Sequence, residues 1–317
     1  MGMTSFSCKG LLLISSLFHS SDTALERSMA VPGNGSVPAL VRTALSIVKS
    51  LPGSSNVIFA DHDNYELQVL MKALSGSAVF QGSALFNPET ADDSNRTSVE
   101  ELVRLARQVR LGHREVKVIL LSDDLTFVSS FGRFSLERRL LGGHSRLLVV
   151  GRLSQQEVNV LSRHWTFSMM NTFFVLPSIK RKSQRWNLFT YLPFTASGSR
   201  LVRVGFWTQS ENLVLPDSNL LFPQKFSNMY GRAVNVSALP YEPYWVEEKT
   251  ADGGVEYSGT DRLMLEAMAA SLNFSISLLP VKSWEEVIKG YQSYSELNNT
   301  SAGRTALLVL GHSWAKD

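Results

Sequence analysis

Cysteine is nearly absent from this chain, since Cys8 is the one cysteine among 317 residues. A disulfide needs two cysteines, so no bridge within the chain can stabilise the fold. Zinc sites built from several thiolates are excluded for the same reason. A chain of this length buries enough apolar surface to fold without such links. Its length favours about two domains.

Long hydrophobic runs are also missing, because no stretch of about 18 apolar residues is present that could span a bilayer. A shorter apolar run, Gly10–Phe18, follows the single positive charge of Lys9 and precedes small polar residues. This order is typical of a secretory signal peptide. We therefore expect a signal peptide over residues 1–24 and an exported chain. A frayed apolar N-terminus is the alternative.

Strong charge of either sign is lacking. The formal net charge is +3, charged residues make up 19% of the chain, and the basic residues are spread out. This argues against nucleic acid as a partner. A hydrophobic content of 44% is typical of globular proteins and argues against disorder.

Signatures of catalysis and of cofactor binding are incomplete. Gly-His-Ser occurs at 143–145 and 311–313, but Leu147 and Ala315 stand where the nucleophile elbow Gly-x-Ser-x-Gly needs its last glycine. The pair of glycines in residues 33–35 lacks the third glycine of a dinucleotide fingerprint. We expect no enzyme and no cofactor.

Residues 30–178 alternate between short apolar runs and helical patterns. This alternation predicts a parallel sheet covered on both faces, in a doubly wound α/β domain. The expected strands are 56–60, 116–121, 146–150 and 172–176. The expected helices are 37–51 after an N-cap at Ser36, 64–74, one opened by a capping box at Ser98–Glu101, and 155–165.

Polar residues follow two of the expected strands, as Asp61-His62-Asp63 and as Ser122-Asp123-Asp124. Ligands of doubly wound sheets bind beyond the carboxyl ends of the strands, so these residues mark the expected position of any ligand. Carboxylate and imidazole groups could also bind a metal. We favour strand-end turns rich in aspartate and expect no metal site. An exported α/β enzyme that uses residues 61–63 remains an alternative.

Residues 179–232 are expected to form a connector, because prolines recur in them and a basic run begins at Lys180. Two strand-like patches lie within this connector, at 186–192 and 200–207. Residues 233–317 begin a second α/β unit, and we expect it to be incomplete. Its expected elements are strands at 234–238, 275–279 and 305–310 and a helix that Thr260 or Asp261 caps and that ends at Leu272.

Six Asn-x-Ser/Thr sequons support export. They begin at Asn34, Asn95, Asn235, Asn273, Asn298 and Asn299. The last two overlap, so we expect one of them to be modified, and we expect Asn273 to be too buried at the end of its helix. The candidate glycosylation sites are therefore Asn34, Asn95, Asn235 and Asn299.

The stretch 221–277 has the most specific pattern. It contains Pro-Tyr-Glu-Pro-Tyr-Trp at 240–245, Tyr-Ser-Gly-Thr-Asp at 257–261, and a helix that ends in Leu-Asn-Phe at 272–274. In this order the segments resemble the start of the ligand-binding domain of ionotropic glutamate receptors. They are more similar still to the divergent arthropod chemosensory ionotropic receptors. The specific resemblance covers residues 186–280, and residues 30–178 fit the amino-terminal domain of that family by pattern alone.

The resemblance implies a periplasmic-binding-protein-like ligand-binding lobe, incomplete in this chain. It implies that the ring of Tyr244 covers a bound small molecule, and that Gly259 and Asp261 shape the wall of the cleft at a helix start. The arginine with which glutamate-binding members grip a carboxylate is not matched, because Arg304 stands in a different context, Ala-Gly-Arg-Thr.

The function implied is the extracellular ligand-sensing region of a ligand-gated cation channel subunit at the plasma membrane, truncated before the pore. Its partners would be a small-molecule ligand and other receptor subunits, and two lobes would close on the ligand. A soluble, exported small-molecule-binding protein of periplasmic-binding-protein-like fold is the alternative.

Overall fold

The computed structural model describes residues 11–14, 38–51, 55–62, 65–75, 82–86, 98–112, 115–178, 185–215, 223–279 and 306–309. The chain divides into two compact units. The first comprises Met1–Tyr191 and Leu201–Phe222, and the second comprises Leu192–Arg200 and Pro223–Asp317. Among the described residues, every helix is too short or too polar to cross a lipid bilayer.

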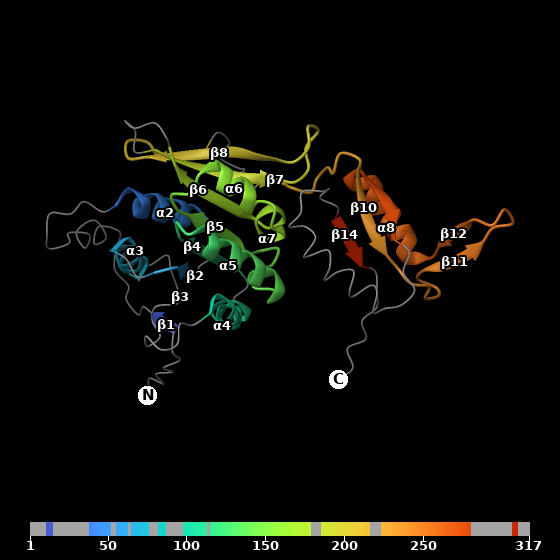
Figure 1. Ribbon diagram of the computed structural model, residues 1–317, viewed down its shortest axis with the longest axis horizontal. Coiled ribbons are helices and arrows are strands. Elements are labelled where there is room, and N and C mark those ends of the chain that lie inside the picture. Colours follow the sequence, from blue (N-terminus) through green and yellow to red (C-terminus); the bar gives the residue numbers. More distant parts are fainter. Residues whose placement is uncertain are drawn as a thin grey trace. The chain divides into compact units, whose positions relative to one another are not determined.

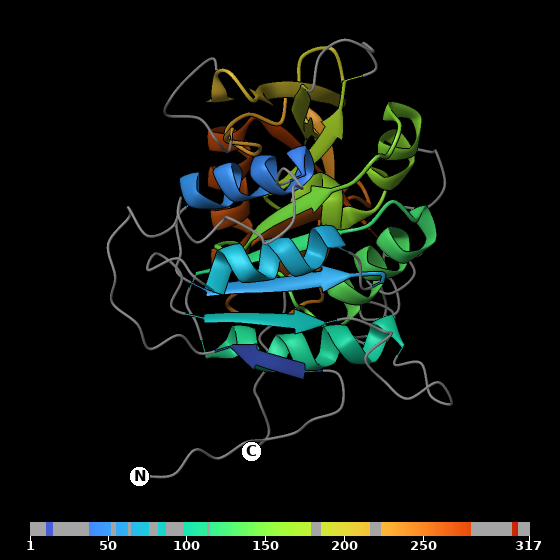
Figure 2. The same ribbon diagram turned by 90° about the vertical axis from the view of Figure 1, so that its left-hand side faces the viewer.

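The first unit is built on a nine-stranded sheet of order β1-β3-β2-β4-β5-β6-β7-β8-β9 (Figure 1). The five strands from β3 to β6 in this order run parallel. Antiparallel β1 and β7 flank them, and β1 lies beside β3 at the edge (Figure 2). The strands are β1 (Leu11–Ile14), β2 (Ser55–Ala60), β3 (Gly82–Phe86), β4 (Val116–Leu121), β5 (Arg146–Val150), β6 (Thr172–Pro177), β7 (Trp186–Leu192), β8 (Arg200–Thr208) and β9 (Asn212–Val214).

The neighbouring strands β2 and β4 are buried along their whole length. Because parallel strands are covered on both faces, their sequences are nearly continuous apolar runs. This pattern made β4 predictable from the sequence. Side chains alternate between the two faces. Phe59 lies opposite Leu120 in one core, and Ile58 lies opposite Ile119 in the other.

Helices cover both faces of this sheet (Figures 1 and 2). The core that contains Phe59 is completed by α4 (Val99–Leu111), α5 (Leu125–Glu137), α6 (Gln155–Leu161) and α7 (Trp165–Met169). The core that contains Ile58 is completed by α2 (Ala39–Ser50) and α3 (Tyr65–Ser75). The chain therefore belongs to the α/β class, with a large and mostly parallel sheet.

Side-chain caps fix three helix starts. The Asp124 side chain accepts the Thr126 N–H at 2.8 Å at the start of α5. At α6, Ser154 and Glu157 form a complete capping box, in which each side chain accepts the other residue's backbone N–H. Ser98 accepts the Glu101 N–H at 3.3 Å at the start of α4.

Several sequence-based expectations for helix ends are wrong. The Glu101 carboxylate accepts Arg104 Nε instead of completing a capping box. The first helix begins at Ala39 after Pro38, later than the expected cap at Ser36. The helix expected over 155–165 is two shorter helices, α6 and α7, since the chain turns at 162–164.

A buried lysine joins the sheet to α2. Lys117 in β4 is 1% exposed, and its Nζ donates to the backbone oxygens of Val48 and Leu51 at 3.2 and 3.3 Å. A cation at the C-terminus of a helix also opposes the negative end of the helix dipole. Burial lowers the pKa of Lys117.

The expectation of a separate connector over residues 179–232 is wrong. Its two strand-like patches are strands, β7 and β8, but they extend the sheet of the first unit. The apolar residues Trp186, Leu188 and Trp207 explain this, because they are buried in the same core as Ile58. Only residues 192–200 and the segment from Pro223 onward belong to the second unit.

The second unit contains a parallel sheet of order β13-β10-β14, formed by β10 (Arg232–Ser237), β13 (Phe274–Leu278) and β14 (Ala306–Val309). Helix α8 (Thr260–Leu272) lies between β10 and β13 in the sequence, and its N-cap residue is Gly259. The expected cap at Thr260 or Asp261 is therefore wrong, although the helix ends at Leu272 as predicted.

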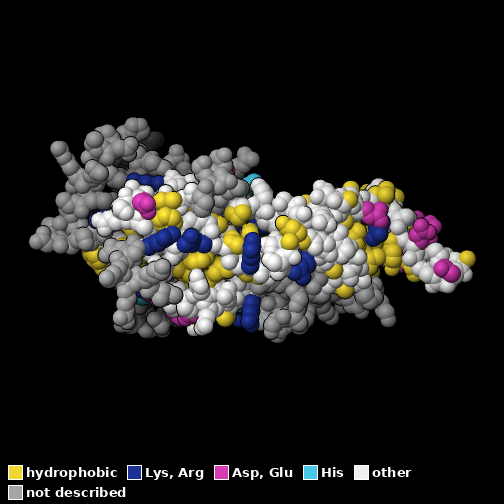
Figure 3. Space-filling model, turned by 90° about the horizontal axis from the view of Figure 1, so that it is seen from above, with side chains coloured by type: hydrophobic (Ala, Val, Ile, Leu, Met, Phe, Trp, Pro, Cys, Tyr) yellow, Lys and Arg dark blue, Asp and Glu magenta, His cyan; other side chains and the backbone are white. Residues whose placement is uncertain are grey.

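A two-stranded hairpin, β11 (Val246–Lys249) and β12 (Val255–Ser258), precedes α8. These two strands were not predicted from the sequence. Glu248 lies directly opposite Glu256 in the antiparallel register. Acidic side chains gather at this hairpin in Figure 3.

Strand β1 lies inside the segment expected to be a signal peptide, and it pairs antiparallel with β3. The remainder of residues 1–24 lies outside the described residues, and the signal peptide stays a prediction. Asp63 and the candidate glycosylation sites Asn34, Asn95 and Asn299 also lie outside the described residues.

Candidate functional site

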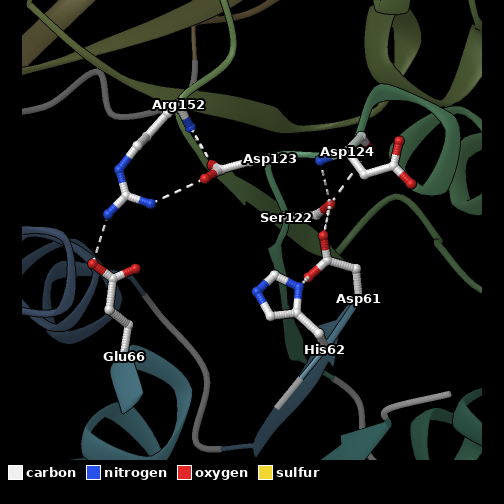
Figure 4. Close-up of polar contacts among 7 residues, drawn as sticks. All are labelled: Asp61, His62, Glu66, Ser122, Asp123, Asp124 and Arg152. Atoms are coloured by element: carbon white, nitrogen blue, oxygen red, sulfur yellow. Dashed lines mark hydrogen bonds and ion pairs between the residues drawn. The ribbon is translucent and has the colours of Figure 1, made fainter. Parts of the chain in front are cut away.

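Polar side chains from three strand ends meet at the carboxyl edge of the first sheet (Figure 4). The parallel strands β2 and β4 are neighbours, and the chain leaves β2 for β3 on its other side. In open α/β sheets such a reversal of strand order leaves a crevice at the strand ends, where ligands bind. Asp61 follows β2 and Ser122 follows β4, and the two side chains meet at this edge.

Asp61 is held between two neighbours. Ser122 Oγ donates to Asp61 Oδ2 at 2.6 Å, and His62 Nδ1 lies against Asp61 Oδ1. The Ser122 hydroxyl also accepts the Asp124 N–H at 2.9 Å. A nucleophile, base and carboxylate triad needs histidine in the middle. Here the carboxylate is in the middle, so this geometry does not activate the serine.

Arg152 forms a second set of contacts at this edge. Its guanidinium donates to Asp123 Oδ2 at 3.0 Å and to Glu66 Oε1 at 2.7 Å, and its backbone N–H donates to Asp123 Oδ1 at 2.5 Å. Partial burial lowers the pKa of Arg152, but the bonds and charges of Asp123 and Glu66 outweigh this and raise it. The arginine thereby links the end of β5 to β4 and α3.

Gly151 permits this close approach. A Cβ on Gly151 would lie 2.1 Å from the backbone oxygen of Ser122. Gly151, Arg152 and Glu66 were missed by sequence reasoning. The signal for Arg152 was present, because it follows the predicted strand 146–150 in the same way that Asp61 and Ser122 follow theirs.

The cluster at this edge is satisfied internally. Asp61 and Asp123 are engaged by neighbouring donors, and Asp124 caps α5. Within the described ranges, no group of three or more His, Cys, Asp or Glu could hold a metal ion. The geometry therefore fits a polar lock between strand ends.

The second candidate site is the turn that follows β10. Tyr241 and Trp245 pair as an isolated antiparallel bridge, and the Tyr244 N–H donates to the Tyr241 oxygen at 2.8 Å. Trp245 is buried, whereas Tyr241 and Tyr244 are 51% and 36% exposed. The two tyrosine rings are stacked, with centroids 5.7 Å apart and planes inclined by 10°.

This tyrosine turn, residues 241–245, is fixed to the start of α8. The Thr260 N–H donates to the Pro243 oxygen at 3.3 Å, and the Asp261 N–H donates to the Tyr244 oxygen at 3.0 Å. These donors belong to the first turn of the helix, where N–H groups have no partner within the helix. The turn therefore supplies backbone acceptors where a side-chain cap is lacking.

Gly259 makes this docking possible. Its φ is 106°, a region that favours glycine. A Cβ there would lie 2.4 Å from the Tyr244 oxygen. Asp261 lies in the first turn of α8, where a negative charge is favourable.

The second unit repeats the topology of the first at its centre. β10 lies between β13 and β14, so the chain leaves the first strand on one side and later returns on the other. The tyrosine turn directly follows the carboxyl end of β10. The sequence identified Tyr244 as a candidate, but the structure adds Tyr241 as its stacking partner.

Asn235 is the one candidate glycosylation site within the described residues. It lies in the middle of β10, is partly buried, and has a neighbouring strand on each side.

No protein-family model matches this chain, and a sequence comparison with curated proteins returns no match.

Proposed function

We propose that this chain is the extracellular ligand-sensing region of a chemosensory ionotropic receptor, a ligand-gated cation channel subunit related to the ionotropic glutamate receptors. One observation carries the proposal. The exposed ring of Tyr244 stands beyond the carboxyl end of the central strand β10, at a reversal of strand order, on a turn docked to α8.

The position is where physical reasoning independently puts a ligand. Parallel α/β sheets bind ligands outside the strand ends at such a reversal. An aromatic face supplies large contact area with few rotatable bonds, so little conformational entropy is lost on binding. The bonds from α8 and the stacking on Tyr241 hold the Tyr244 ring in place before a ligand arrives.

The order of elements also supports the proposal. The β10 strand, the tyrosine turn, the β11–β12 hairpin, Gly259, α8 and β13 follow one another in the order that the family resemblance implies. We propose that this is the first part of a periplasmic-binding-protein-like lobe, and that segments beyond Asp317 complete the clamshell and the pore. The first unit would then be a doubly wound amino-terminal domain.

The remaining parts of the proposal are location and partners. The chain would enter the secretory pathway through its N-terminal signal and lie on the outer side of the plasma membrane with other receptor subunits. A chain without downstream spans would instead be a secreted small-molecule-binding protein. Sequencing the transcript beyond the Asp317 codon separates the two: three apolar spans and a second α/β half support the receptor, and a stop codon in every transcript contradicts it.

Ligand contact at Tyr244 is testable on the full chain. Saturation-transfer NMR with L-glutamate, propionate and a primary alkylamine as probes should show contact with at least one of them. Tyr244→Ala should abolish that contact, and Tyr244→Phe should keep it because the ring face is retained. Tyr65→Ala serves as the control, because Tyr65 lies in the first unit and, at 50% exposed, is more accessible than Tyr244. Contact that survives Tyr244→Ala unchanged would exclude this ring from the ligand site.

A further inference from the structure

The C-terminal turn of α8 presents an asparagine to solvent. Asn273 follows the last helical residue and adopts a left-handed conformation, with φ 54° and ψ 60°. It is exposed, so the expectation that Asn273 is too buried for modification is wrong. Its Nδ2 donates to Asn228 Oδ1 at 3.0 Å.

The left-handed turn explains an asparagine here, because asparagine tolerates positive φ better than most residues. The left-handed turn gives no reason for a serine at position 275. The Ser275 side chain is exposed, and its hydroxyl donates to the Gly231 oxygen over a long 3.4 Å. Asn273, Phe274 and Ser275 together form a sequon whose acceptor and hydroxyl both face solvent.

Asn235 has the opposite surroundings. It lies opposite Ser277 of β13 and Leu307 of β14, so its strand is enclosed on both sides. The hydroxyl residue of its sequon, Ser237, is 4% exposed. A glycan is bulky and solvated, so its attachment in the middle of a sheet would displace neighbouring elements.

We propose that Asn273 is an N-glycan acceptor of the second unit and that Asn235 is not. The donor would be an oligosaccharide linked to a polyprenyl pyrophosphate. The bond between the sugar C1 and the pyrophosphate oxygen breaks, a bond from C1 to Asn273 Nδ2 forms, Nδ2 loses one proton, and the polyprenyl pyrophosphate leaves.

The acceptor geometry is compatible with the finished fold. An amide nitrogen carries two hydrogens, and the glycosylated form keeps one of them. That hydrogen is sufficient for the bond to Asn228 Oδ1. The glycan would keep the surface formed by residues 228–231 and 273–275 in solvent, so receptor subunits would dock elsewhere on the second unit.

This inference rests on the proposed export of the chain, and the experiment separates the two. The full chain would be secreted from a eukaryotic cell line in two forms, one with its own N-terminus and one with an established leader placed before Met1. Enzymatic release of the glycans in heavy-oxygen water marks each occupied asparagine, and peptide mass spectrometry locates it.

With the added leader, Asn273 should be occupied and Asn235 unoccupied. Ser275→Ala should abolish occupancy at Asn273 while leaving the Asn273 cap intact, and Ser275→Thr should preserve it. Secreted protein with an unmodified Asn273, or with a glycan at Asn235, would overturn the proposal. Occupancy with the added leader but none with the native N-terminus would support the site and overturn the proposed native export signal.

Discussion

The backbone oxygen of Tyr244 accepts the Asp261 N–H at 3.0 Å, which fixes the exposed tyrosine turn to the first turn of α8. Gly259 lies two residues before the donor, and its backbone approaches the Tyr244 carbonyl so closely that a side chain has no room. The position of the candidate ligand-binding ring therefore depends on a residue that would not touch the ligand.

Gly259→Ala should destabilise the second unit. The added Cβ would lie 2.4 Å from the Tyr244 oxygen, and a φ of 106° is unfavourable for alanine. We expect a loss above the roughly 1–3 kcal/mol that this glycine-restricted backbone region costs an ordinary residue. Hydrogen exchange measured by mass spectrometry should become faster across residues 241–262.

Gly253→Ala is the matched control for that substitution. Gly253 has a φ of 85°, but no atom lies within 4 Å of a Cβ placed there. It should show the backbone strain without the collision and leave exchange in the tyrosine turn unchanged. Equal effects of the two substitutions would show that close approach to Tyr244 is unimportant.

Lys117→Met should destabilise the first unit. The substitution leaves the backbone oxygens of Val48 and Leu51 without the ammonium that binds them. An unsatisfied buried polar group costs about 1–3 kcal/mol, partly offset here because a buried charge is removed. Urea unfolding would measure the change. Lys49→Met, at an exposed lysine of the same helix end, should stay within about 0.5 kcal/mol.

Ser122→Ala tests the polar lock between β2 and β4. The Ser122 hydroxyl is 5% exposed and joins the Asp61 carboxylate to the Asp124 N–H, so its removal leaves a donor and an acceptor unpaired. We expect a loss on the order of 1–3 kcal/mol in urea unfolding. Ser50→Ala, which removes an exposed hydroxyl bonded within α2, is the control. A loss no larger than that control would mean that the lock contributes little to stability.

Lys225 should make stability depend on pH. It is 5% exposed, and burial lowers its pKa to about 7 from an ordinary value of 10.5. Between these values the unfolded chain binds more protons than the folded chain, so the free energy of unfolding should rise with pH across this window. Below about 7 both states are protonated, and the contribution of Lys225 becomes flat.

Lys225→Met should flatten that rise and stabilise the protein near neutral pH, by on the order of a few kcal/mol. Urea unfolding at intervals from about pH 6 to 10 would measure the difference between the two proteins. The pKa of Lys117 is also lowered, but this contribution is present in both proteins and cancels in the difference. Parallel curves for the two proteins would contradict the assignment to Lys225.

The parallel core could be predicted from sequence because its residues obey a simple rule. Strands such as β4, which is apolar apart from Lys117, are buried on both faces, and helices such as α4 begin with a recognisable cap. Helix α5 was missed because Ser129, Ser130 and Gly132 interrupt its apolar pattern. A Cβ at Gly132 would lie 2.5 Å from the Phe167 ring, which is a reason that only the folded structure provides.

Residues of the candidate sites could be predicted from sequence only where their position after a strand was enough to place them in the fold. Asp61 and Ser122 both follow parallel strands, so their meeting followed from topology. The stacking of Tyr241 on Tyr244 and the clamp of Arg152 on Glu66 join side chains through turns whose geometry no local pattern specifies. Burial of Lys117 and Lys225 was likewise invisible, because lysine is an exposed residue in most proteins.

The like-charged pair Glu248 and Glu256 gives the β11–β12 hairpin a gradient of stability. Carboxylates directly opposite one another repel, and an isolated two-stranded hairpin is marginal in water. The base is anchored, since the Tyr257 ring lies 5.7 Å from the ring of buried Trp245. Opening should therefore start at the glycine tip and stop at Tyr257, so the hairpin would fray repeatedly while the tyrosine turn stays closed.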